Sequence, residues 1–283
     1  MKIPNFAHVA AVILCTCGAA CAEGLDEMAA PINHPTIFED PRPYTEIRPI
    51  YIYHKIDNDF VTSGGEANIY AVQLRYAVDD RLGIIATKDG YVDLNADSVL
   101  DDQEGFADLS VGVKYAFFRD DAARQIATLG LRYEIPTGEE EVFQGQGDGA
   151  LNPFLSGAYG LGPVNIMLGT GFRFAFDNDD SSFYDAGLQF DTKIGSFHPV
   201  VDFNLSHVIS DGNRLAIADE GEDFFNFGAS ESDGKTLVSA GLGMRVDLAD
   251  NVIFGVSYQI PLTEGQGSNL LDYRVTSDII FKL

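Results

Sequence analysis

Several residue classes are scarce in this chain of 283 residues, and each absence excludes a class of function. All three cysteines, Cys15, Cys17 and Cys21, precede residue 22, so the rest of the chain has no thiol for disulfides or thiolate metal sites. No stretch approaches the ~20 consecutive apolar residues of a transmembrane helix. The 18 Lys and Arg residues face 43 Asp and Glu residues, and this net charge of -25 argues against nucleic-acid binding by phosphate neutralisation.

Residues 1–22 have the composition of a secretory signal peptide. Lys2 is the only charged residue, Phe6 to Leu14 form a largely apolar core, and an Ala-Cys-Ala sequence supplies small residues for cleavage. The segment is too short for a membrane anchor. A lipoprotein, acylated on Cys21, is the weaker alternative, because Gly18 occupies the position where such sites usually carry Leu.

Residues 23–44 differ from the segments on both sides. They contain four prolines between positions 31 and 43 and show no hydrophobic periodicity. Proline lacks a backbone N–H and fixes φ, so such a segment does not form regular structure. We predict an extended periplasmic segment over residues 23–44, followed by a single domain over residues 45–283.

From residue 45 onward, apolar and polar residues alternate with a period of two. In the final stretch LLDYRVTSDIIFKL, Tyr273 and Val275 share one face while Asp272 and Arg274 share the other. These segments exceed the roughly five or six residues of an ordinary strand and approach the ~9–11 tilted residues that cross a bilayer as β-structure. About twelve of them can be recognised, at 45–56, 66–78, 82–94, 105–118, 124–135, 150–160, 163–177, 182–194, 197–210, 234–248, 251–262 and 270–283.

The connections between these segments alternate in length. Tight turns such as 79–81, 161–162 and 249–250 follow every second segment, whereas longer loops such as 136–149 and 211–233 follow the others. An even strand number with short periplasmic turns and longer external loops is typical of outer-membrane barrels. We therefore predict an all-β fold, a closed antiparallel transmembrane β-barrel of about 12 strands, in the outer membrane of a Gram-negative-type bacterium.

Aromatic residues support this arrangement of strands across the membrane, because they form two bands of Tyr and Phe in a chain that has no Trp. The expected outer band is Tyr70, Tyr133, Phe174, Tyr184, Tyr258 and Tyr273, and the expected periplasmic band is Tyr76, Tyr115, Phe117, Tyr159, Phe190, Phe254 and Phe281. A secreted soluble β-sandwich is the alternative, but its charged face would point outward over an aliphatic core. Twelve long strands and two aromatic bands favour the membrane barrel.

The polar face of each strand is predicted to line the lumen, because an Arg or Lys that faces lipid at mid-depth costs roughly 2–4 kcal/mol. Around eight strands the interior is filled by side chains, whereas 16 to 18 leave an aqueous channel. A twelve-stranded lumen is therefore compatible with a narrow pore and with closure by Arg/Asp pairs. The candidate lumen-lining residues are Arg75, Asp108, Lys114, Arg132, Arg173, Asp185, Asp202, Arg245, Asp272 and Arg274.

The excess acidic residues lie in loops, at 139–141, 177–180 and 219–223. Bridging of divalent cations to lipopolysaccharide is one interpretation, and solvated loop tips that keep the chain soluble in transit are the other. We predict no metal site and no cofactor. The expected partners are outer-membrane lipid and lipopolysaccharide, a small-molecule solute of unknown identity, and the barrel-assembly machinery through the C-terminal strand; nucleic acid is not expected.

Catalysis is not predicted. An outer-membrane hydrolase needs a His beside a Ser nucleophile, and His207 directly follows Ser206. Neighbours in a strand point to opposite faces, so these two side chains are not expected to meet. The Gly-rich stretch 145–149 precedes a strand rather than a helix, which argues against nucleotide binding.

Three stretches carry a family resemblance: ADLSVGVKYAFF (107–118), LGLRYEIPTGEE (129–140) and SGAYGLGPVNIMLGTGFRF (156–174). With them, residues 45–283 resemble the meta-pathway phenol-degradation family of outer-membrane β-barrel proteins. The resemblance implies passive transport of small, often aromatic or hydrophobic, solutes through the barrel, and it carries over no substrate residues. A non-transport surface or structural barrel that acts through its acidic extracellular loops, and an outer-membrane hydrolase, are the alternative hypotheses.

Overall fold

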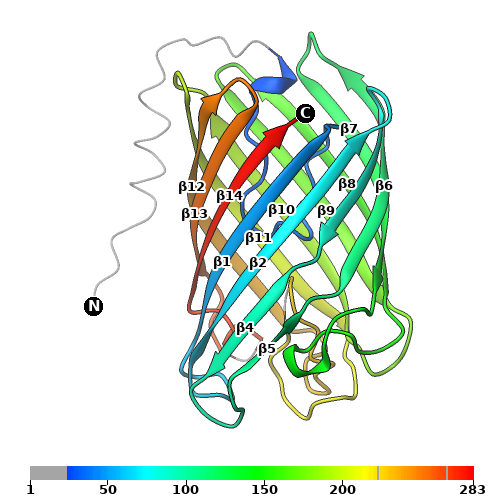
Figure 1. The fold of residues 1–283 in the computed structure, drawn as a ribbon, viewed down its shortest axis with the longest axis vertical. Helices are drawn as coiled ribbons and strands as arrows, with labels where there is room; N and C mark the ends of the chain where they lie inside the picture. Colours follow the sequence, from blue (N-terminus) through cyan, green and yellow to red (C-terminus); the bar gives the residue numbers. More distant parts are fainter. Residues whose placement is uncertain (1–23, 222, 266) are drawn as a thin grey trace.

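The computed structural model describes residues 24–221, 223–265 and 267–283, so the predicted signal peptide lies outside the described residues. The described chain is nearly all β-structure, in one antiparallel sheet that closes on itself (Figure 1). The strands are β1 (Glu46–Ile56), β2 (Gly65–Ala77), β3 (Leu82–Lys88), β4 (Tyr91–Ala96), β5 (Gln103–Phe106), β6 (Leu109–Asp120), β7 (Gln125–Ile135), β8 (Ala150–Leu161), β9 (Val164–Ala175), β10 (Ser182–Thr192), β11 (Phe197–Ser210), β12 (Thr236–Ala249), β13 (Val252–Pro261) and β14 (Tyr273–Lys282).

Twelve strand positions close the barrel. β1 pairs with both β2 and β14, and this pairing joins the two ends of the sheet. β3 and β4 both pair with β2 and follow one another in a single strand position. β6 pairs with β3 and β5 pairs with β4, so β5 and β6 together form the next strand position. The break between β3 and β4 lies at Gly90, whose φ is 130° and where a Cβ would come within 2.4 Å of the Tyr70 carbonyl oxygen. The predicted closed barrel of about 12 strands is confirmed.

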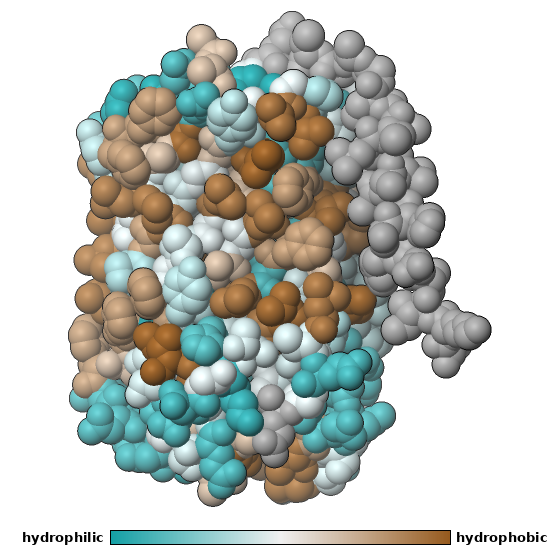
Figure 2. Space-filling model, turned by 180° about the vertical axis from the view of Figure 1, so that it is seen from behind, coloured by the Kyte–Doolittle hydropathy of each residue, from teal (hydrophilic) through white to brown (hydrophobic). Residues whose placement is uncertain are grey.

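The alternation along each strand separates an outward apolar face from an inward polar face. In β2, Tyr70, Leu74 and Tyr76 are exposed at 52%, 48% and 59%, whereas Gln73 and Arg75 are buried at 1% and 4%. Figure 2 shows hydrophobic residues gathered in a broad belt around the middle of the barrel, with hydrophilic residues toward both ends. Closure leaves no sheet edge with unpaired backbone groups, which is the requirement for residence in hydrocarbon.

The longer loops gather at one end of the barrel and the short turns at the other (Figure 1). We refer to these ends as outer and periplasmic, following the usual arrangement of such barrels. Residues 211–221 and 223–235, which we name the outer loop, fold over the outer end. Their Phe224, Phe225 and Phe227 are buried and pack into an apolar cluster with wall residues such as Ile56 and Leu270.

Residues 24–44, which we name the plug, lie inside the barrel (Figure 1). The plug begins near the periplasmic end with a short 3-10 helix, η1 (Leu25–Glu27), and most of its residues after position 30 are buried. This corrects the prediction of an extended periplasmic segment over residues 23–44. A proline-rich chain cannot pair its backbone with a strand, and here inward side chains of the wall supply donors to its carbonyl groups.

No helix among residues 24–221, 223–265 and 267–283 has the length and apolar character to span a membrane.

Candidate functional site

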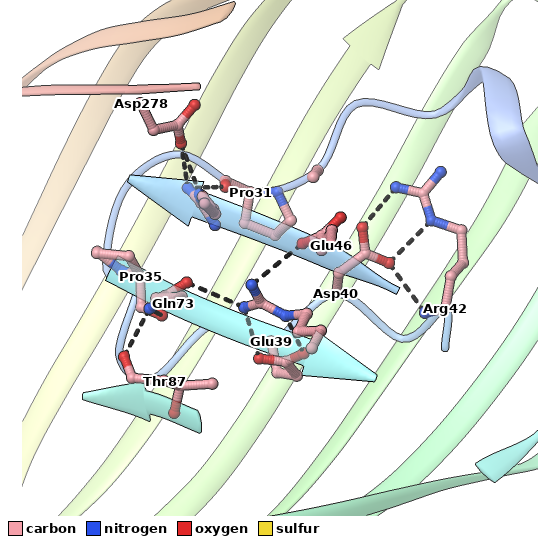
Figure 3. Close-up of polar contacts among 12 residues, drawn as sticks. Pro31, Pro35, Glu39, Asp40, Arg42, Glu46, Gln73, Thr87 and Asp278 are labelled. Carbon is pink, nitrogen blue, oxygen red and sulfur yellow. Dashed lines mark hydrogen bonds and ion pairs between the residues drawn. The ribbon is translucent and has the colours of Figure 1, made fainter. Parts of the chain in front are cut away.

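Glu39 of the plug is the centre of a buried ion cluster. Its carboxylate accepts hydrogen bonds from Arg75 at 2.8 and 3.0 Å, from the Lys114 ammonium at 2.7 Å and from Arg132 at 3.1 Å. Glu46 adds a second carboxylate to Arg75 at 3.1 Å. The three bases come from β2, β6 and β7, so one plug carboxylate joins three strands of the wall. Figure 3 shows Glu39, Glu46 and Gln73 close together in this cluster.

A second cluster surrounds Asp278 of β14, next to the first along strand β1. Arg245 donates to its carboxylate at 2.7 and 3.0 Å, and Arg48 donates to it at 2.7 Å. Both guanidinium groups also donate to the Pro31 carbonyl, at 2.9 and 2.8 Å, and Arg245 reaches the Ala30 carbonyl at 2.6 Å. These contacts fix the plug backbone to β1, β12 and β14.

Wall amides and the plug's own ion pair hold the remaining backbone. Gln73 donates to the Pro35 carbonyl at 2.7 Å, and Gln189 donates to the Ala29 carbonyl at 2.8 Å. Within the plug, Arg42 pairs with Asp40 and donates to the carbonyls of Leu25 and Met28. The plug therefore contacts walls on several sides of the lumen, and the lumen is closed by this segment rather than by Arg/Asp pairs across the wall alone.

The ring of Phe38 in the plug packs against two glycines of the wall. A Cβ built at Gly169 or Gly187 would lie 2.7 or 2.6 Å from the Phe38 ring. These glycines face each other in the register of β9 and β10, so the wall is thinnest where the ring packs. Any larger residue at either position would displace the ring.

The structure places the ten predicted lumen residues as follows. Eight are buried, namely Arg75, Asp108, Lys114, Arg132, Asp185, Asp202, Arg245 and Arg274. Arg173 is half-buried and pairs with Asp185 at 2.8 Å. Asp272 is exposed and precedes β14, so its assignment to the lumen is wrong. The alternation places Asp272 in the lumen only for a strand that begins before Tyr273.

Two of these residues have roles that the alternation alone does not reveal. Asp202 accepts the amide of Asn33 in the plug at 2.8 Å. Asp108 lies between β5 and β6 and accepts backbone N–H groups of Gly138 and Gly145 at 2.9 and 2.8 Å, so it holds the loop after β7. Both carboxylates therefore have structural partners.

Glu39, Asp40 and Arg48 are not among the lumen residues that the sequence predicts. Arg48 lies on the polar face of a predicted strand, so the alternation could have identified it. Glu39 and Asp40 lie in a segment without periodicity. The only available signal is that the predicted inward faces carry more bases than acids, and an acidic pair elsewhere in the chain could balance that excess.

A cavity of about 200 Å³, which we name the outer pocket, lies at the outer end between the wall and the loops. Its apolar lining includes Ile56, Phe60, Phe143, Leu215, Ile217, Phe225, Phe227 and Leu270. Among the described residues that line it, two have polar side-chain atoms, His54 and Thr62, and both are engaged. His54 Nε2 hydrogen-bonds the Leu270 carbonyl at 2.8 Å, and the Thr62 hydroxyl donates to the Gly64 carbonyl at 2.7 Å.

Aromatic rings form much of the outer pocket. Phe227 stacks with Phe225 at a centroid distance of 5.9 Å, packs edge-on against Phe143 at 4.9 Å, and contacts Phe60 at 6.0 Å. Such ring pairs favour a further aromatic partner in an offset or edge-on arrangement. The pocket therefore favours neutral apolar molecules over charged ones, whose desolvation would be left uncompensated.

A larger hollow of about 550 Å³ lies on the membrane-facing side of β7 to β12. The outward side chains Leu155, Leu168 and Phe203 contribute to its lining and are exposed at 48%, 54% and 40%. Acyl chains contact this surface when the barrel is in a membrane. This hollow is therefore a lipid-facing surface and not a cavity of the barrel interior.

The acidic loop residues include several that hold turns. Asp177 accepts the backbone N–H groups of Asp179 and Asp180 at 2.7 and 3.0 Å. Burial acts to raise the pKa of Asp177, but these and a further backbone donor hold it below its ordinary value. In the described part of the chain, no three or more His, Cys, Asp or Glu side chains are arranged to hold a metal ion.

Ser206 and His207 point to opposite faces, as the alternation predicts. The Ser206 hydroxyl donates to Asp185 inside the barrel at 2.8 Å. His207 Nδ1 instead hydrogen-bonds the Thr236 hydroxyl on the neighbouring strand at 2.7 Å. The two side chains do not form a nucleophile–base pair.

Comparison with known proteins agrees with the barrel and its loops. The family model described as "Putative MetA-pathway of phenol degradation" matches residues 53–269. The chain belongs to this family. Its model covers the strands from within β1 to the loop before β14. It includes the residues that line the outer pocket except Leu270, whereas the plug lies outside the matched range.

Two solved structures share the fold of this family member. An outer membrane channel from Pseudomonas putida F1 is 17% identical and has a TM-score of 0.63, with 91% of this chain and 98% of that chain covered. The NanC porin is 11% identical with a TM-score of 0.54, and the match covers 84% of this chain and 100% of that chain. No curated protein matches the sequence. The protein is thus an outer-membrane β-barrel with the fold of channels and porins.

Proposed function

We propose that this protein carries small neutral apolar solutes, single aromatic rings among them, across the outer membrane. A solute enters the outer pocket first and passes through the lumen when the plug moves. The observation that supports this most is the lining of the outer pocket, which combines four phenylalanines with two polar side chains that are already hydrogen-bonded. The pocket thus offers a solute apolar contact and aromatic faces.

The size of the outer pocket supports a ring-sized solute. Its volume of about 200 Å³ exceeds that of an engineered apolar cavity of roughly 150 Å³ that binds benzene. A long acyl chain would extend well beyond it. Membership of the phenol-degradation family is consistent with single-ring compounds as solutes.

Truncation of Phe227 tests this function. We expect Phe227→Ala to weaken toluene binding, and toluene uptake at limiting concentration, by roughly tenfold, because a ring contact contributes about 0.5–1.5 kcal/mol beyond buried area and 1.4 kcal/mol is tenfold. Uptake is measured with radiolabelled toluene in cells that express the protein. Phe106→Ala is the matched control, since Phe106 lies at the same end of the barrel but is 60% exposed and contacts Tyr91.

The two alternative hypotheses predict different results. A surface or structural barrel acting through its acidic loops would give no uptake above that of cells without the protein. A hydrolase would give products from an ester or lipid substrate. Equal uptake by Phe227→Ala and the unaltered protein would contradict the proposed entry site.

A further inference from the structure

The outer loop, the barrel wall and the plug meet at Asp223. The Asp223 carboxylate accepts two hydrogen bonds from Arg274 of β14, at 3.0 and 2.9 Å. Its backbone carbonyl accepts the Thr36 hydroxyl of the plug at 3.0 Å, and its carboxylate lies 3.7 Å from Nδ1 of His34. Burial acts to raise the pKa of Asp223, but Arg274 and His34 hold it well below its ordinary value, so the carboxylate is charged.

Arg274 also connects Asp223 to the outer pocket. Arg274 Nε donates to Nδ1 of His54 at 3.1 Å, and the His54 ring lines the pocket. From the other side, Phe225 follows Asp223 by two residues in the outer loop and also lines the pocket. Two side chains that a solute would contact are therefore linked to the plug through Asp223 and Arg274.

These contacts leave little room for independent movement. Asp223, Arg274, His54 and Phe225 are all at most 4% exposed. A solute that moves from the pocket toward the lumen has to displace the Phe225 ring or the His54 ring, because packed interiors move between discrete arrangements rather than deforming continuously. Displacement of Phe225 moves the loop segment that carries Asp223.

We infer that occupancy of the outer pocket releases the plug. A solute that displaces Phe225 draws Asp223 away from Arg274 and from Thr36 of the plug, so binding at the outer end favours opening of the lumen. This regulation rests on the proposed function, because it requires the outer pocket to bind the solute. By thermodynamic linkage, release of the plug changes the affinity of the pocket for the solute by the same factor, typically about 5- to 150-fold.

A thiol introduced into the plug measures this coupling. Residues 22–283 contain no cysteine, so Ile37→Cys in a chain that lacks residues 1–21 gives a single reporter in a half-buried plug position. Its rate of reaction with maleimide is measured with and without saturating toluene. We expect toluene to raise the rate about 5- to 150-fold, and we expect Asp223→Asn to raise the rate without toluene and to remove most of the response.

Asp219→Asn is the matched control, because Asp219 lies in the same loop and accepts the N–H groups of Gly267 and Asn269. It should respond to toluene as the unaltered loop does. Should Asp223→Asn fail to fold, Thr36→Val removes the plug's hydrogen bond to Asp223 and is expected to shift the basal rate in the same direction.

Toluene binding is measured in the same samples and separates the two proposals. Binding without a change of maleimide rate overturns the coupling and leaves the proposed function in place. A response in Asp223→Asn equal to that in Asp219→Asn also overturns it. Absence of toluene binding overturns both the coupling and the proposed function.

Discussion

Deletion of residues 26–40 is expected to convert the barrel into a permanently open pore. The deleted residues include most of the buried plug, whereas residues 41–45 remain to lead into β1 at the periplasmic end. Water would replace the plug, and the wall side chains that now donate to it would be hydrated. A twelve-stranded barrel without a plug lies between the filled eight-stranded and the open sixteen-stranded barrels, so a narrow conducting pore is expected.

The charges that remain in that pore determine which ions it favours. The deletion removes the carboxylates of Glu39 and Asp40, while Arg75, Lys114 and Arg132 stay on the wall. We therefore expect steady conductance steps in planar bilayers, with anions favoured over cations in a salt gradient. The intact protein measured in parallel should give a current close to the closed baseline. Equal currents from a deletion variant that retains its β-structure would contradict closure by the plug.

Glu39→Gln is the single substitution with the largest expected effect. The amide keeps the shape of the side chain but leaves the cations of Arg75, Lys114 and Arg132 buried around a neutral group. Removing one partner from a buried ion cluster costs about 3–5 kcal/mol. Here that cost applies to the closed arrangement, because the three bases can be hydrated when the plug leaves.

The expected result is a rise in the open fraction by roughly 10²- to 4 × 10³-fold, since each 1.4 kcal/mol is tenfold. Open probability in single-channel recordings measures it. Glu141→Gln is the control, because it makes the same change at an exposed loop carboxylate. An open probability for Glu39→Gln that matches this control would contradict the central role of the cluster.

The wall of the barrel could be predicted from the sequence because its determinants are local. A period of two places Arg75, Lys114 and Arg245 inward without knowledge of any partner. The same rule fails at Asp272, because alternation continues past the point where β14 begins and where the side chain turns to solvent. The alternation identifies the face of the strand on which a residue lies, but it does not identify where the strand ends.

The plug and the outer pocket could not be predicted because their contacts are distant in the sequence. Glu39 meets Arg132 only after the barrel closes, and its own segment has no periodicity that would point it inward. The outer pocket takes Phe60, Phe143 and Phe227 from three separate loops. Each phenylalanine is an ordinary loop residue until the fold brings the three together.

The position of the plug can be measured directly by disulfide formation between Phe38→Cys and Gly187→Cys. A Cβ at position 187 would lie 3.0 Å from Cγ of Phe38. Because Cγ is bonded to Cβ, the two Cβ atoms lie no more than about 4.5 Å apart, which is the upper end of the range that a disulfide spans. Phe38→Cys combined with Gly162→Cys is the control, since position 162 lies in a periplasmic turn with nothing within 4 Å. We expect nearly complete oxidation of the first pair in the folded barrel and none in the control. Two thiols in the first pair that both stay free and react with maleimide would contradict a lumen closed by residues 24–44.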